Sequence, residues 1–280
     1  MKRVLILFCI LIIPILILVK ILQIKILEKN GNIWVYEYEG ERCLAFSLPI
    51  ISPRQTCMNL KDNRKVVFEY QKFALSSLFL NPDPKTILII GLGGGSLANA
   101  LHYLLPDSHI DVVEIDDKVI EIASRYFNLT INDRLKVFHD DGINFVSNST
   151  TSYDLIVLDA FDEEYIPQSF LTDSFVVSVK KILNKNGIIV VNTFSKSKYE
   201  SLEDALYEKH FGNFYSLESN NRVIIAGKVL QVDEIERNSH KFDNIFSQLG
   251  IENNELLEKI IKSYKKVIPC DKNICYYNNK

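Results

Sequence analysis

The stretch TILIIGLGGGS, residues 86–96, decides the fold class. Residues 87–90 are all apolar and are typical of a buried strand, and a helical pattern begins near residue 96. The glycines between them allow a tight turn and let backbone N–H groups approach a ligand closely. The stretch therefore predicts a strand, a ligand-binding loop and a helix, although glycine-rich strand ends also occur as plain turns.

Strand-like and helix-like segments alternate after this unit. Further strands are predicted at 110–115, 135–138, 155–158 and 188–192, and helices at 96–105, 118–127 and 172–183. Continuous apolar strands separated by helices imply a parallel sheet that is covered on both faces. We therefore expect an α/β, Rossmann-like fold, with 224–226 as a candidate edge strand.

The rest of the chain divides around this core. Residues from about 33 to 60 read as a small β unit, 66–80 as a helix ended by prolines, and the chain after about 230 as polar and helical. The predicted parts are a transmembrane anchor, a small β unit with a linking helix, a Rossmann-like domain and a polar helical tail, at 1–27, 28–80, 81–228 and 229–280.

An apolar run at residues 4–19 follows Lys2 and Arg3 and is broken only by Pro14. As a helix it spans roughly 24 Å, against about 30 Å of membrane hydrocarbon. No small-residue cleavage site follows, so we expect a retained single-pass anchor, with a cleaved signal peptide or a buried core helix as the alternatives. Lysines on both sides leave the orientation in the membrane open.

Composition excludes several classes of function. The 280 residues carry a net charge of −3, which argues against a broad nucleic-acid-binding surface. None of the five cysteines sits in a paired C-x-x-C arrangement with histidines, so we expect no metal. The histidines are scattered and no nucleophile elbow is present, so hydrolysis has no support. The redox state of the cysteines stays open.

Carboxylates follow the next two strands. Glu114 ends the second strand, 23 residues after Gly91, where a carboxylate is expected to bind both hydroxyls of a ribose. The spacing does not separate a dinucleotide site from an S-adenosyl site. Asp141, after the third strand, is placed to accept a hydrogen bond from an adenine amine, and a helix-capping role is the alternative.

The fourth strand runs into Asp159 and Asp162. Ligands of open parallel sheets bind at the carboxyl ends of the strands, so these two aspartates are expected to face one pocket. A carboxylate there can hold an ammonium or take a proton from an attacking amine. It can also stabilise a sulfonium electrostatically. A solvated acidic loop is the alternative.

Taken in order, Ile-Ile-Gly-x-Gly-Gly-Gly, Val-Glu-Ile-Asp, Asp-Asp-Gly and Tyr-Asp-Leu-Ile-Val-x-Asp-x-x-Asp resemble the spermidine synthase (polyamine aminopropyltransferase) family over roughly 33–226. The resemblance implies the S-adenosylmethionine-dependent methyltransferase fold. It also implies transfer of an aminopropyl group from decarboxylated S-adenosylmethionine to putrescine or a related small amine. Family members often associate through the N-terminal β unit, so a homodimer is an expectation by analogy.

The family pattern assigns the donor contacts residue by residue. Gly91, Gly93 and Gly95 would line the donor nucleoside, Glu114 would bind its ribose and Asp141 its adenine. These assignments come from the resemblance.

The acceptor contacts are assigned in the same way. Asp159 and Asp162 match the family's Asp-x-x-Asp, so Asp162 would be the base that deprotonates the attacking amine. Tyr70 and Gln71 resemble the Tyr-Gln pair of the amine pocket, and Gln55 matches the glutamine of the preceding strand. For Tyr70 and Gln71, a helix face packed on the core is the alternative.

Three departures from the family pattern keep other functions open. Gly94 stands where the family has an aspartate that pairs with the donor's ammonium, apolar Val66 and Val67 replace an acidic pair, and Glu163 replaces a proline. The sequence around Gly91-Leu-Gly-Gly-Gly and Asp159-Ala-Phe resembles a divergent branch of the family that often carries membrane segments. The alternatives are a methyltransferase that uses S-adenosylmethionine with an unknown acceptor, and a catalytically silent nucleoside-binding scaffold on a membrane.

Overall fold

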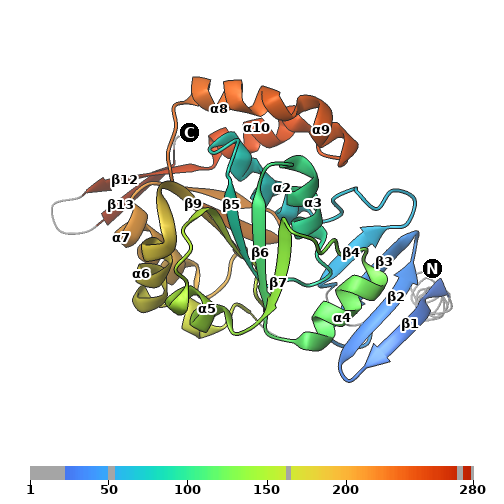
Figure 1. Ribbon diagram of the computed structural model, residues 1–280. Coiled ribbons are helices and arrows are strands. Elements are labelled where there is room, and N and C mark those ends of the chain that lie inside the picture. Colours follow the sequence, from blue (N-terminus) through green and yellow to red (C-terminus); the bar gives the residue numbers. More distant parts are fainter. Residues whose placement is uncertain (1–22, 50–53, 162–164, 270–273, 279–280) are drawn as a thin grey trace, which may run out of the picture.

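The computed structural model describes residues 23–49, 54–161, 165–269 and 274–278, which form two sheets with helices around the larger one (Figure 1). The smaller, N-terminal sheet is antiparallel, and its strand order follows the sequence. Its strands are β1 (Lys25–Asn30), β2 (Ile33–Tyr38), β3 (Glu41–Ala45) and β4 (Thr56–Asn59). Residues 25–27 therefore belong to this sheet and not to the predicted anchor.

The larger sheet has the strand order β13-β12-β10-β11-β9-β8-β5-β6-β7. Strands β5 to β9 are parallel where they pair, and the remaining pairs are antiparallel. The chain adds strands on one side of β5 and then returns to add β8 on the other side. The switch point of the topology therefore lies between β5 and β8, where ligands of such sheets bind. The parallel strands are β5 (Thr86–Ile90), β6 (His109–Glu114), β7 (Leu135–His139), β8 (Tyr153–Leu158) and β9 (Leu183–Phe194).

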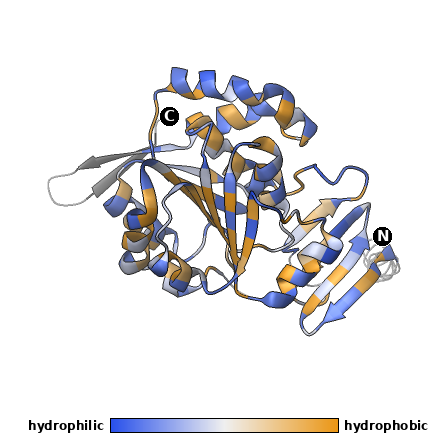
Figure 2. Ribbon diagram, in the orientation of Figure 1, coloured by the Kyte–Doolittle hydropathy of each residue, from blue (hydrophilic) through white to orange (hydrophobic). Residues whose placement is uncertain are grey.

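Helices cover both faces of this sheet because its strands are apolar on both sides. Ile87 and Ile89 pack into one core and Leu88 and Ile90 into the other, as the alternation of side chains along a strand requires. Figure 2 shows the apolar strands between helices with polar outer faces. One face is covered by α2 (Glu69–Leu75), α3 (Ser96–Leu104), α8 (Val232–Ser239), α9 (Asp243–Gln248) and α10 (Asn253–Lys262), and the other by α5 (Gly142–Asn148), α6 (Asp173–Ile182) and α7 (Glu200–Phe211).

The N-terminal sheet packs against the larger domain through α4 (Asp117–Tyr126). Val119, Ile122 and Phe127 form one buried cluster with Ile33 and Leu44 of the sheet. The four-stranded sheet therefore has a hydrophobic face of its own, and this face packs against α4 and the residue that follows it.

Two expectations for the C-terminal part are corrected. The candidate edge strand at 224–226 lies inside the sheet, as β11 (Asn221–Gly227), between β9 and β10 (Phe214–Glu218). An apolar run shows that a strand is buried but not which strands flank it, so the sequence did not reveal the β10–β11 hairpin. The tail is also not helical throughout, because β12 (Tyr264–Pro269) and β13 (Ile274–Asn278) extend the sheet.

The anchor expected at residues 4–19 lies outside the described residues. Within the part of the chain that the structure describes, no helix combines the length and the apolar character needed to cross a membrane.

Candidate active site

The glycine loop connects β5 to α3 at the switch point of the sheet. Gly91, Gly93 and Gly95 have φ angles of 97°, 53° and 76°, which are strained for residues that carry a side chain. A Cβ at Gly91 would also lie 2.2 Å from the carbonyl oxygen of Asp159. The glycines therefore bring the ends of β5 and β8 together and leave the loop backbone uncovered by side chains of its own.

Glu114 at the end of β6 is buried beside this loop. Its Oε2 accepts a hydrogen bond of 2.9 Å from the backbone N–H of Leu92, and its Oε1 accepts one of 3.0 Å from that of Asp116. Each carboxylate oxygen has more than one acceptor direction, so the side chain can still bind hydroxyl donors. The next residue, Ile115, is 66% exposed and offers an apolar surface at the same crest of the sheet.

Asp141 caps α5. Its Oδ1 accepts hydrogen bonds from the backbone N–H groups of Ile143 and Asn144, at 2.8 and 3.1 Å. Asp141 therefore does cap the helix, which was the alternative role. The second oxygen, Oδ2, has no hydrogen-bond partner among the described residues.

Asp159 lies at the end of β8, and its partly buried carboxylate is held from two sides. Asn192 donates to Oδ1 at 2.7 Å, and the Tyr70 hydroxyl donates to Oδ2 at 3.2 Å. Burial raises the pKa of Asp159 from 3.8 to about 6, these two hydrogen bonds oppose the rise, and the charge of Glu114 adds to it. At neutral pH Asp159 is therefore an ionised carboxylate with an unusually high affinity for a proton.

Tyr70 of α2 contacts this carboxylate, and Gln71 in turn contacts Tyr70. Gln71 is 3% exposed, and its Nε2 lies 3.4 Å from the Tyr70 hydroxyl. Its Oε1 is buried without a hydrogen-bond partner among the described residues. A buried acceptor without a donor costs free energy, so this atom suits an amine ligand that donates to it.

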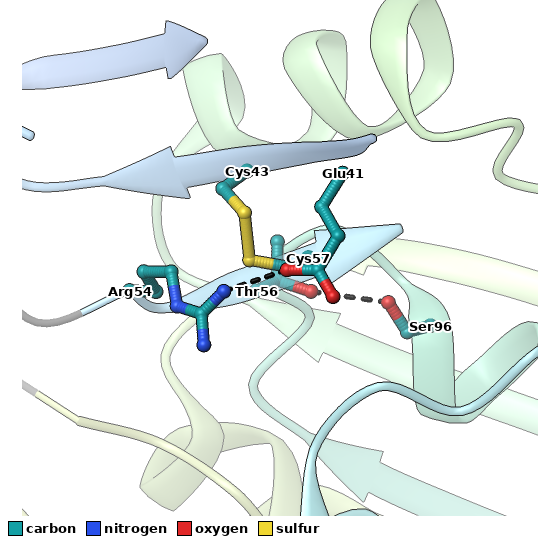
Figure 3. The surroundings of a disulfide bond; sticks show 6 residues. All are labelled: Glu41, Cys43, Arg54, Thr56, Cys57 and Ser96. Carbon is teal, nitrogen blue, oxygen red and sulfur yellow. Dashed lines mark hydrogen bonds and ion pairs between the residues drawn. A yellow bond between two sulfur atoms is a disulfide. The ribbon is translucent and has the colours of Figure 1, made fainter. Parts of the chain in front are cut away.

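The N-terminal sheet reaches the glycine loop through Thr56 of β4 (Figure 3). The Thr56 hydroxyl lies 3.0 Å from that of Ser96, the first residue of α3. A Cβ at Gly94 would lie 2.5 Å from Thr56 Cγ2, so position 94 has no room for a side chain unless its neighbours move. Next to Thr56, Cys57 forms a disulfide bond with Cys43 across the β3–β4 pair.

Gln55 and Asp162 are the other two predicted acceptor residues. Gln55 directly precedes β4 and is partly buried, and its backbone N–H donates to Leu44, but no hydrogen bond joins its side chain to another described residue. Asp162 lies outside the described residues. Their proposed roles rest on the family resemblance.

Sequence reasoning missed Asn192, which is 4% exposed and is the direct partner of Asp159. A polar residue that ends the apolar run of the fifth strand was the available signal, because the ends of parallel strands meet at one edge. Asn221, which donates to Asn192 at 3.0 Å, carries no such signal, because it begins an antiparallel strand.

Together these features define a class of protein. A bare glycine loop with a carboxylate at the end of the next strand is typical of nucleoside binding, and a proton-accepting carboxylate beside a buried amide suits the transfer of a group to an amine. The fold and the site are those of a nucleoside-dependent transferase with an S-adenosylmethionine-dependent methyltransferase-like fold.

Comparison with known proteins identifies the family. The spermine/spermidine synthase domain matches residues 68–218. A polyamine aminopropyltransferase from Vibrio vulnificus is 40% identical over 203 residues, which are 70% of this chain and 68% of that protein. The crystal structure of a spermidine synthase in complex with the transition-state analogue AdoDATO has a TM-score of 0.64 at 22% identity, over 84% of this chain and 85% of that one. The chain therefore belongs to the spermidine synthase (polyamine aminopropyltransferase) family.

A methyltransferase is also similar to part of the chain. An eEF1A lysine and N-terminal methyltransferase from Xenopus laevis is 32% identical over 161 residues, which are 51% of this chain and 23% of that protein. The spermidine synthase family and the S-adenosylmethionine-dependent methyltransferase-like fold predicted from the sequence are confirmed, whereas the predicted membrane-anchored branch stays a prediction.

Proposed function

We propose that this aminopropyltransferase moves an aminopropyl group from decarboxylated S-adenosylmethionine to a small amine such as putrescine. The observation that carries the proposal is the contact between Asp159 and Tyr70. Next to Tyr70, Gln71 has a buried Oε1 that no described residue hydrogen-bonds. This arrangement offers a carboxylate and a neutral oxygen to an amine, next to the glycine loop that would hold the donor.

In the proposed reaction, the lone pair of the acceptor nitrogen attacks the donor carbon that is bonded to the sulfonium sulfur. A new C–N bond forms, the C–S bond breaks, and its electron pair leaves with sulfur as a neutral thioether. The proton that the nitrogen loses passes to a carboxylate. A carboxylate that is buried beside the sulfonium also stabilises the positive charge of the donor more effectively than a solvated one.

The residue roles follow the family pattern and the geometry. Gly91, Gly93 and Gly95 would present backbone to the donor, Glu114 would bind its ribose and the second oxygen of Asp141 its adenine.

On the acceptor side, Asp159, Tyr70, Gln71 and Gln55 would bind the amine, and Asp162 would take its proton. If Asp162 is the base, Asp162→Asn abolishes turnover and leaves donor affinity largely intact. Surviving turnover would assign the base elsewhere.

Gly94 supports a second candidate, methyl transfer from S-adenosylmethionine to an unknown acceptor. Thr56 Cγ2 and the Phe127 ring would lie 2.5 and 3.0 Å from a Cβ at position 94, so this chain has packed the place of the family's aspartate. An extra carboxylate on the donor therefore meets no acidic side chain from this position. The methyltransferase relative is consistent with this candidate.

Calorimetric titration of the full chain with both donors separates the candidates. We expect tighter binding of the decarboxylated donor, and mass spectrometry should detect putrescine that has gained one aminopropyl group. Tighter binding of S-adenosylmethionine without aminopropyl transfer would favour the methyltransferase. Binding of neither donor would favour the silent scaffold.

The apolar run at residues 4–19 supports a single-pass membrane anchor and so the membrane-carrying branch of the family. Fractionation of the full chain and of a chain without residues 2–22 tests this. Only the full chain should resist extraction of membranes with alkaline carbonate.

A homodimer through the N-terminal sheet is proposed by analogy with the family. Strand β1 is an edge of this sheet among the described residues, and its Ile26 is 44% exposed. Exposed edge strands favour pairing with another chain. Sedimentation of Ile26→Lys against the unaltered chain tests this, and the variant should sediment as a monomer.

A further inference from the structure

Two asparagines form a hydrogen-bonded series that ends at Asp159. Asn192 of β9 donates from Nδ2 to Asp159 Oδ1 at 2.7 Å. Asn221 of β11 donates from Nδ2 to Asn192 Oδ1 at 3.0 Å. β9 and β11 are neighbouring strands, so the two amides lie on a rigid part of the sheet and not on a loop.

The outer amide sets the direction of the inner one. An asparagine side chain has one oxygen that accepts and one NH2 group that donates. Because Asn221 donates to the oxygen of Asn192, the NH2 group of Asn192 must face Asp159. The backbone of Asn221 is held in place, since its backbone carbonyl oxygen accepts hydrogen bonds from Ser219 N at 2.7 Å and Ser195 Oγ at 2.9 Å.

We propose that Asn221 and Asn192 form a positioning relay that holds Oδ1 of Asp159 and so leaves Oδ2 as the oxygen that serves the acceptor amine. Oδ1 has the shorter hydrogen bond, at 2.7 Å, whereas among the described residues Oδ2 has only the longer one from Tyr70, at 3.2 Å. The relay acts through Asp159, so both asparagines are positioning residues. The link to the amine rests on the proposed function, but the relay itself does not.

The groups that face Asp159 define what else can change its protonation. Among the described residues these are Tyr70 of α2, Asn192 of β9 and the charge of Glu114 at the end of β6. Burial also raises the pKa of the Tyr70 hydroxyl, which therefore stays a neutral donor at physiological pH. Tyr70 connects Asp159 to Gln71. Asn192 connects it to Asn221, and substitution of Asn221 can reverse the direction of the Asn192 amide.

Asn221→Asp is the decisive variant. The new carboxylate cannot donate, so it competes with Asp159 for the NH2 group of Asn192. When the amide of Asn192 turns over toward residue 221, it presents its oxygen to Asp159. An acceptor facing a carboxylate favours the protonated form. We expect the titration midpoint of Asp159 to rise by about one pH unit or more.

Carbon-13 NMR of the full chain, labelled in its aspartate carboxyl groups, measures this midpoint directly. Asp159→Asn identifies the signal, and Asn192→Leu, which removes the donor, should also raise the midpoint. In the double variant Asn192→Leu/Asn221→Asp, the substitution at 221 should change the midpoint little, because residue 192 no longer has an amide that can turn over. Full additivity would show that Asn221→Asp acts only through its charge and would overturn the relay.

The matched control is Asn238→Leu on α8, which removes one amide hydrogen bond, to the carbonyl oxygen of Phe79 at 3.0 Å, on another part of the molecule. The titration midpoint of Asp159 should not change in this variant. Thermal melting checks that each variant is folded. An unchanged midpoint in folded Asn221→Asp would also overturn the proposal. Because NMR needs no turnover, a midpoint shift without aminopropyl transfer would uphold the relay and reject the proposed function.

Discussion

Asp159 shows how one residue acquires a chemical property from its surroundings. A solvated aspartate is ionised far below neutral pH, whereas burial raises the pKa of Asp159 to about 6, against the effect of its hydrogen bonds from Asn192 and Tyr70. A carboxylate with this pKa is charged at the pH of most cells but close to the range in which it can hold a proton. General bases work best when their pKa lies near the working pH.

The pH dependence of turnover should therefore have an acid limb from Asp159. Its carboxylate must be ionised to bind an ammonium group or accept a proton, and the ionised form is lost as the pH falls through about 6. We expect kcat/KM for the amine to fall about tenfold per pH unit below that value. Steady-state kinetics from pH 5 to 8.5 measure this. Activity that stays constant down to pH 5 would contradict the assignment.

Glu114 should control donor affinity. Glu114→Ala removes the carboxylate at the ribose position, and hydrogen bonds to a charged group contribute about 1.5–3 kcal/mol. We therefore expect donor binding to weaken roughly 10- to 100-fold by calorimetry. Glu121→Gln, on the exposed surface of α4, is the control and should leave the affinity unchanged. If Glu114→Ala binds the donor as tightly as the unaltered chain, the ribose assignment is wrong.

At the scale of elements, β4 joins the N-terminal sheet to the donor loop. The strand has four residues, of which Cys57 is covalently held to Cys43 and Thr56 contacts Ser96 and Gly94. Among the described residues, Glu41 lies close to Cys43 and Cys57, and the three are residue types that can bind a metal ion. Both cysteines, however, are bonded to each other in the disulfide. The bond therefore fixes a short strand that borders the glycine loop.

Removing this disulfide should weaken both stability and donor binding. The cysteines are 14 residues apart in sequence, and closing a loop of that size contributes roughly 3 kcal/mol through the entropy of the unfolded chain. We expect the double variant Cys43→Ala/Cys57→Ala to melt several degrees lower and to bind the donor more weakly, because Thr56 loses its support.

Differential scanning calorimetry and donor titration below the melting transition measure the two effects. Cys9→Ala, in the N-terminal run, is the control that keeps both bonded cysteines. A double variant with the melting temperature of the unaltered chain would contradict the structural role of the disulfide.

At the scale of the whole molecule, the C-terminal helices are part of the core that carries the acceptor pocket. Phe246 of α9 is fully buried, with its ring centroid 5.7 Å from that of Phe79. Lys259 of α10 forms an ion pair of 2.7 Å with Glu69, the residue before Tyr70. The polar tail, in which the sequence showed no chemistry, therefore braces the helix that presents Tyr70 to Asp159.

Phe246→Ala should destabilise the entire domain. Truncation of a fully buried phenylalanine costs about 3–5 kcal/mol, and the ring belongs to the same core as the central strands. We expect one cooperative transition at a lower denaturant concentration, and a higher KM for the amine. Val232→Ala on α8, where the side chain is 49% exposed, is the control. A separate early transition would show that the tail folds independently.

The local pattern of the sequence determined the strand–glycine loop–helix unit, the alternation around it and the place of Glu114. Each of these depends on residues close together in the chain, through backbone preference and side-chain periodicity. For the same reason the family motifs were readable, since they lie at the ends of predictable strands.

Only the tertiary structure decided which side chains meet. Tyr70 and Asp159 are 89 residues apart, and the Asn221–Asn192–Asp159 series joins three strand ends. Such contacts follow from the order and direction of the strands. A run of apolar residues does not reveal either, as the antiparallel insertion of β11 between β9 and β10 shows. A pattern along one strand records that its neighbours are apolar, whereas the identity of those neighbours is set by the packing of the whole chain.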